Sequence, residues 1–178
     1  MLGRGVLSRL HTLTQAEGST LTLYLDIDQN KRANRNQGFL VQAEALVKEL
    51  RARFPEDERL RTAASHALGL LEGLEPQGKT ALAVVHEESG LAEVHSAGVA
   101  LPSSAHWRRG AFLRPVVEVM DEHERYGVVL TDQHRARLFT VYMGEVTEHS
   151  DLFSTVSQRT PTTARDQIWS QKRQQRHH

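Results

Sequence analysis

The sequence contains no cysteine among its 178 residues. This absence excludes disulfides, zinc fingers, other thiolate metal sites and a cysteine nucleophile at once. A chain without disulfides suits the reducing cytoplasm, which is the location that we expect. No apolar run reaches the length that a membrane span needs, so no membrane contact is predicted.

Several common signals are missing as well. Residues 1–13 carry Arg4, Arg9 and His11 among their apolar residues and lack the continuous apolar core of a signal peptide. There is no Gly-x-Ser-x-Gly elbow, Walker loop or dinucleotide fingerprint, and the internal histidines are scattered without metal-binding spacing. We therefore assign no catalytic residue, no metal and no cofactor, and the sequence favours a non-catalytic protein over an enzyme.

Charge is balanced overall but unevenly distributed. The chain has 22 basic and 22 acidic residues, yet the last twenty residues hold five basic and one acidic. An RNA or phosphate contact is expected first in such a basic segment, although a solvated helix end explains it equally well. The candidate RNA-binding residues there are Arg165, Lys172, Arg173 and Arg176.

Apolar periodicity predicts an α/β fold. Leu21, Leu23, Leu25 and Ile27 alternate with polar residues, which predicts a strand over 20–28. Helices are expected near 7–13, over 38–53, from Pro55-Glu56-Asp57 to about Glu75, and from Pro115 to about His123. A hairpin is expected over 81–85 and 91–99, with an exposed loop over 29–37 and an irregular segment over 102–109. Residues 1–124 are thus predicted to form an N-terminal mixed α/β sandwich domain.

Residues 125–178 are predicted to form a second, partial domain. It contains strands over 126–132, 136–143 and 145–153, a loop over 154–165 and a basic helix over 166–178. Such a short meander cannot bury much apolar surface by itself, so the unit looks truncated. Its exposed strands leave open a homodimer through this second unit.

Three stretches carry a resemblance to a known family. The order of elements around Thr22-Leu23-Tyr24-Leu25-Asp26-Ile27-Asp28, followed by Gly127-Val128-Val129-Leu130-Thr131-Asp132 and Ala136-Arg137-Leu138-Phe139, resembles bacterial release-factor-like proteins. These belong to the archaeo-eukaryotic peptide-chain release factor superfamily, with the eukaryotic class-1 release factor and Pelota. The resemblance implies that residues from 125 open a ribonuclease-H-like domain, and that the ribosome or tRNA is the partner.

The family's two functional motifs are altered in this chain. In the family, a Gly-Gly-Gln loop promotes ester hydrolysis; if Ser170, Arg173 and Arg176 match the residues that follow it, the triplet falls on Gln167-Ile168-Trp169. Ile168 and Trp169 cannot adopt the backbone angles open to glycine, so peptidyl-tRNA hydrolysis is not predicted. The family's codon-reading Asn-Ile-Lys-Ser loop is replaced by Arg53-Phe54-Pro55-Glu56-Asp57.

Three alternatives remain open. Asp26 and Asp28, or Asp132 with Glu145 or Glu148, could serve a divalent-metal-dependent nuclease or hydrolase, whereas the alternative interpretation is that these aspartates only cap turns. Trp107 followed by Arg108 and Arg109 could stack a nucleobase and hold phosphate, or the indole could pack under the arginine stems. The chain could also be a non-catalytic protein-interaction domain.

Overall fold

The computed structural model describes residues 2–132, 136–142 and 145–149 of the chain. Its internal contacts divide it into two compact units, the first comprising Met1–Tyr126 and Val141–Val146, and the second the remaining residues. The two units are described separately below. The predicted domain boundary between residues 124 and 125 stays a prediction.

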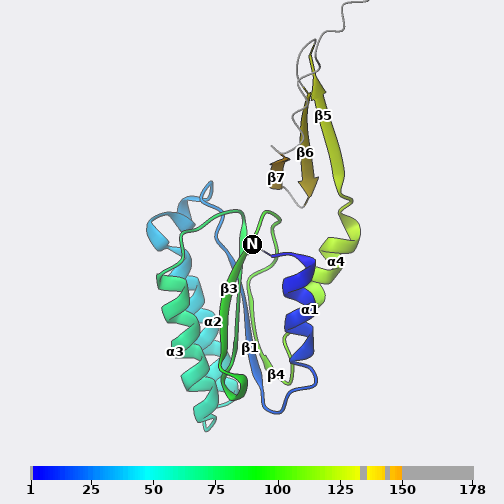
Figure 1. Ribbon diagram of the computed structural model, residues 1–178. Helices are drawn as coiled ribbons and strands as arrows, with labels where there is room; N and C mark the ends of the chain where they lie inside the picture. Colours follow the sequence, from blue (N-terminus) through cyan, green and yellow to red (C-terminus); the bar gives the residue numbers. More distant parts are fainter. Residues whose placement is uncertain (1, 133–135, 143–144, 150–178) are drawn as a thin grey trace, which may run out of the picture. The chain divides into compact units, whose positions relative to one another are not determined.

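The first unit is built on a four-stranded antiparallel sheet (Figure 1). Its strands are β1 (Thr20–Asp26), β2 (Thr80–His86), β3 (Leu91–Ala97) and β4 (Ser104–Arg108), in the order β3-β2-β1-β4. The two central strands are almost entirely buried, which requires cover on both faces of the sheet. The helices supply this cover.

Two hydrophobic cores lie on opposite faces of this sheet. Helices α2 (Phe39–Arg53) and α3 (Glu58–Glu72) cover one face, where Leu21, Leu23 and Leu25 of β1 are buried. Helices α1 (Arg4–Thr12) and α4 (Arg114–Glu122) cover the other face, where Tyr24 is buried. Successive side chains of β1 therefore point into two different apolar cores, one on each face of the sheet. The predicted mixed α/β class is confirmed.

Two buried polar side chains of the second core, Thr22 and Tyr24, are hydrogen-bonded to Phe112. The hydroxyl of Tyr24 donates to the carbonyl of Phe112 over 2.6 Å, and the backbone N–H of Phe112 donates to the hydroxyl of Thr22 over 3.0 Å. Because buried polar atoms are costly without partners, these two bonds fix the chain between β4 and α4 against the sheet. They also allow Thr22 and Tyr24 to be fully buried.

Three predictions about local structure were wrong in part. Residues 104–108, expected to be irregular, form β4, which pairs with β1 along the whole of its length. The expected exposed loop includes a 3₁₀ segment, η1 (Arg32–Gln37), in which Asn34 is only 6 % exposed. The second long helix ends at Glu72, before Gly73, and not near Glu75.

The second sheet has the predicted three strands. They are β5 (Tyr126–Thr131), β6 (Ala136–Tyr142) and β7 (Glu145–His149), in the order β5-β6-β7. Arg137 on β6 contacts both carboxylate oxygens of Glu148 on β7, each over 2.7 Å. Residues 150–153 of the predicted third strand, the loop over 154–165 and the helix over 166–178 lie outside the described residues. Within the described part of the chain, no helix is long and apolar enough to cross a membrane.

Candidate nucleic-acid interface

Four chain connections meet at one end of the first unit's sheet, where β1 and β3 begin and β2 and β4 end (Figure 1). We call this surface the four-loop end, and its residues are 13–19, 53–59, 86–90 and 107–111. Side-chain contacts link these connections into a closed ring. The linking pairs are Trp107–Asp57, Arg109–Ala16, His86–Glu17 and Arg59–Glu88.

Asp57 joins the start of α3 to β4. Its Oδ1 accepts a hydrogen bond from the backbone N–H of Leu60 over 3.1 Å, which is the usual role of an aspartate N-cap. Its Oδ2 accepts the indole N–H of Trp107 over 2.8 Å. Burial raises the pKa of Asp57, but the hydrogen bonds from Trp107 and from the Leu60 and Arg59 backbones outweigh it, so the pKa is lowered. The carboxylate is therefore held ionised at neutral pH.

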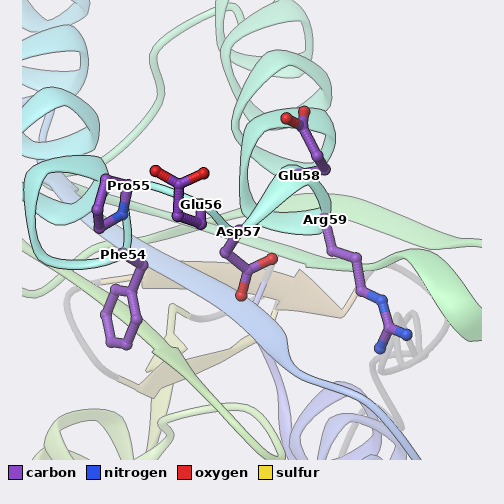
Figure 2. Close-up of a pocket in the computed structure, with 6 residues that line it drawn as sticks. All are labelled: Phe54, Pro55, Glu56, Asp57, Glu58 and Arg59. Atoms are coloured by element: carbon purple, nitrogen blue, oxygen red, sulfur yellow. The ribbon is translucent and has the colours of Figure 1, made fainter.

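A shallow pocket of about 540 Å³ lies along the α2–α3 connection, lined by residues 54–59. Figure 2 shows Phe54 and Asp57 pointing to one side of the connection, whereas the carboxylates of Glu56 and Glu58 point to the other. Phe54 is 40 % exposed, so part of an aromatic ring is open to solvent here. An exposed aromatic ring is one of the groups on which a nucleobase can stack.

The structure places Trp107 and Arg108 on opposite faces of the sheet. Because side chains alternate along a strand, Trp107 packs on the α2–α3 core, whereas Arg108 lies over the ring of Phe112 at 5.8 Å on the opposite face. The indole N–H is already used by Asp57. The predicted joint platform of Trp107 and Arg108 is therefore not formed.

Three arginines come at the ends of two elements that contact each other: Arg53 ends α2, Arg108 ends β4, and Arg109 follows it. Burial lowers the pKa of His106, and the positive charges of Arg108 and Arg53 lower it further. Among the described residues, Arg53, Arg108 and Arg109 have no acidic partner. Arg109 donates to the carbonyl of Ala16 over 3.3 Å. We call Arg53, Arg108 and Arg109 the arginine cluster.

Arg53 was not among the RNA-binding candidates from the sequence. It follows Lys48 and Arg51 on α2, which looks like an ordinary solvated helix face. The pairing of β4 with β1 places β4 in contact with α2, the helix that ends at Arg53. The signal available in the sequence was the basic last turn of α2 directly before Pro55.

His86 closes the other side of the four-loop end. The imidazole is 1 % exposed, and its Nδ1 accepts the backbone N–H of Ser89 over 3.2 Å. Nε2 must therefore carry the proton that is donated to the carbonyl of Glu17 over 2.8 Å. This histidine is structural: it ties the α1–β1 connection to the turn after β2.

Asp26 and Asp28 lie at the other end of β1, where they cap a turn. Asp26 accepts the backbone N–H of Asp28 over 3.1 Å and the amide of Asn34 over 2.9 Å, and it also pairs with Lys31. Asp28 accepts the backbone N–H of Asn30 over 2.9 Å. Burial raises the pKa of Asp26, but Lys31, the Asp28 N–H and Asn34 outweigh it and lower the pKa. The predicted turn-capping role is confirmed.

Other predicted residues are placed as follows. Glu148, a suggested partner of Asp132, pairs with Arg137 instead, and this hydrogen bond lowers its pKa. In the described ranges, no group of three or more His, Asp or Glu residues is arranged to hold a metal ion. The remaining RNA-binding candidates and the Gly-Gly-Gln equivalent, residues 165–176, lie outside the described residues.

Comparison with known proteins finds a family-model match over the C-terminal part of the chain. Residues 111–178 match the family model of bacterial archaeo-eukaryotic release factor family 10. The resemblance inferred from the sequence is therefore confirmed over this segment, which begins just after β4 and includes α4 and the second sheet. Residues 1–110 lie outside the match.

Two solved structures are similar to the chain. An archaeal protein is 14 % identical with a TM-score of 0.40, and the similarity covers 82 % of this chain and 42 % of that one. The archaeal translation termination factor aRF1 is 14 % identical with a TM-score of 0.38, covering 96 % of this chain and 48 % of that one. The chain thus spans less than half the length of either structure. No curated protein matches the sequence.

Proposed function

We propose that this chain is a translation-associated protein that binds the ribosome or tRNA and does not hydrolyse peptidyl-tRNA. The observation that carries the proposal is the match of residues 111–178 to a release-factor family. The absence of hydrolysis follows from Gln167-Ile168-Trp169, which stands where the resemblance expects Gly-Gly-Gln. The second sheet would then open a ribonuclease-H-like domain.

The arginine cluster supports RNA as the partner. Three exposed guanidinium groups without acidic partners in the described part of the chain can each contact a phosphate. The exposed ring of Phe54 follows Arg53 directly, which places a surface for base stacking beside a phosphate-binding group. A second basic region in the sequence, Arg165, Lys172, Arg173 and Arg176, would add contacts in the family-matched segment.

The test is a salt series of tRNA binding, followed by fluorescence anisotropy. The logarithm of the binding constant falls linearly with the logarithm of the salt concentration. Each phosphate that a cationic side chain neutralises makes this slope steeper by about 0.7 to 0.9. The variant Arg108→Ala/Arg109→Ala should therefore bind more weakly at low salt, and its slope should be shallower than the wild-type slope by about 1.5.

A matched control is available at the opposite end of β1. Arg32 and Arg35 are exposed residues of η1, and Arg35 donates to the carbonyl of Gln29 over 3.2 Å, as Arg109 does to Ala16. The variant Arg32→Ala/Arg35→Ala removes the same charge and should keep the wild-type slope. Equal slopes for the two double variants would refute the arginine cluster as the RNA contact.

A further inference from the structure

The arginine cluster is supplied by two separate elements of the first unit. Arg53 is the last residue of α2, whereas Arg108 ends β4 and Arg109 follows it. Long cationic side chains bind one RNA together most strongly when their backbones are already held in place, because binding then has less to order. The contacts that hold the end of α2 against the end of β4 therefore determine how well the three arginines act together.

The α2–α3 connection that follows Arg53 is fixed by hydrogen bonds. The N–H of Phe54 donates to the carbonyl of Arg51 over 3.1 Å, and the N–H of Asp57 donates to the carbonyl of Phe54 over 3.2 Å. The side chain of Asp57 then caps α3 by accepting the N–H of Leu60. Asp57 is therefore held in a fixed position relative to the end of α2.

Trp107 links this connection to the end of β4. Its indole N–H donates to Oδ2 of Asp57 over 2.8 Å, and its ring packs on the α2–α3 core. Arg108 is the next residue in the chain. A short path therefore runs from Arg53 through the turn to Asp57, across one hydrogen bond to Trp107, and on to Arg108.

We propose that Trp107 and Asp57 are positioning residues for RNA binding, because their hydrogen bond holds Arg53 in place relative to Arg108 and Arg109. This inference rests on the proposed function, since it takes the arginine cluster to be the RNA contact. The indole N–H is donated to Asp57, and the carboxylate of Asp57 repels phosphate. The pair therefore acts on RNA binding through the arginines.

The expected effect is a loss of affinity without a loss of charge. Without the bond, RNA has to order the end of β4 and the end of α2 when it binds. Ordering one long side chain lowers affinity by about 3- to 10-fold, so Trp107→Phe should raise the dissociation constant for tRNA by this factor. Its salt slope should be shallower than the wild-type slope by about 0.7 to 0.9, the contribution of one phosphate contact.

The test is the tRNA salt series with Trp107→Phe, Arg53→Ala and the double variant, each first checked for folding by far-UV circular dichroism. If the bond acts through Arg53, Trp107→Phe should have little further effect when Arg53 is already alanine. Asp57→Ser breaks the same bond from the other side and keeps the helix cap. It should weaken tRNA binding as Trp107→Phe does, although removal of a negative charge by itself would strengthen it.

A control for lost stability is available at the opposite end of the sheet, where β2 begins. Thr80 is buried, and its hydroxyl donates to the carbonyl of Val99 over 2.8 Å and accepts the N–H of Leu101 over 2.9 Å. Thr80→Val removes these buried hydrogen bonds and should keep the wild-type affinity and slope. A loss of affinity in Thr80→Val equal to that in Trp107→Phe would overturn the positioning role, because lost stability alone would then explain both.

The remaining outcomes separate this inference from the proposed function. Wild-type affinity and slope in Trp107→Phe, with weaker binding by Arg108→Ala/Arg109→Ala, would overturn the positioning role and leave the proposed function standing. A full effect of Trp107→Phe in the Arg53→Ala background would also overturn it. Wild-type binding by Arg108→Ala/Arg109→Ala would overturn the arginine cluster as the RNA contact, and the positioning role with it.

Discussion

Replacing Asp57 with alanine should destabilise the first unit by about 2 kcal/mol. The carboxylate has two separate roles, because one oxygen caps α3 and the other accepts the Trp107 indole N–H. Loss of an N-cap costs about 1 kcal/mol, and loss of a hydrogen bond to a partly exposed carboxylate costs about 1 kcal/mol more. The substitution therefore weakens both a helix start and its link to β4.

Two further variants separate these contributions. Asp57→Ser keeps a capping oxygen but is too short to reach the indole, so it should cost only about 1 kcal/mol. Trp107→Phe removes the indole N–H and leaves the cap. In a double-mutant cycle, Asp57→Ala and Trp107→Phe should show a coupling energy of about 1 kcal/mol.

The assay is urea unfolding followed by far-UV circular dichroism. Tryptophan fluorescence is unsuitable, because Trp107 is one of only two tryptophans in the chain. Because the pKa of Asp57 is lowered in the folded state, its stabilisation is complete above the unfolded pKa of about 3.9 and is lost as the pH falls through the folded value. The difference between wild type and Asp57→Asn should accordingly shrink below about pH 4.

A negligible cost for Asp57→Ser would refute this reasoning, since it would show that the indole bond contributes nothing. Additive costs in the double-mutant cycle would refute it in the same way. Either result would leave β4 held to the α2–α3 connection by apolar packing alone.

Two pairs of substitutions, each a test with its control, probe the fold. Tyr24→Phe removes the buried hydroxyl that donates to Phe112 and should cost about 1 to 2 kcal/mol by urea unfolding, whereas Tyr126→Phe, at an exposed position, should be neutral. Burial raises the pKa of Tyr24, so the wild type should also lose stability above about pH 10, and the phenylalanine variant should lose less. Gly78→Ala should cost about 2 kcal/mol or more, because Gly78 has φ +81° and an added Cβ would lie 2.5 Å from the carbonyl oxygen of Ala97. Gly69→Ala, on α3 where an added Cβ has nothing within 4 Å, should instead stabilise by about 0.5 to 1 kcal/mol in the same urea assay.

The sequence predicts most of the first unit because its core elements have clear periods. The alternation from Leu21 to Ile27 defined β1, and the helical spacing before Pro55 defined α2, whose end at Arg53 is as predicted. β4 was missed because it has only five residues and polar side chains on one face. What makes this segment a strand is the free edge of β1, which lies elsewhere in the sequence.

The candidate site was less predictable for the same reason. Arg108 and Arg109 were found as a basic pair, but the alternation that turns Trp107 away from Arg108 depends on the strand that was missed. Arg53 joins the arginine cluster only through the packing of α2 beside β4. Burial of Asn34 likewise depends on contacts with Asp26 and Asp28, which a local polar composition does not reveal.

Ribosome binding is tested by cosedimentation of the full chain with 70S ribosomes at low and high salt. Three proteins are compared: the wild type, the Arg108→Ala/Arg109→Ala variant and the Arg32→Ala/Arg35→Ala control. We expect the wild type and the control to pellet with ribosomes at low salt and to be released at high salt, and the arginine-cluster variant to bind more weakly. Failure of the wild type to pellet at either salt would contradict a ribosome-binding role.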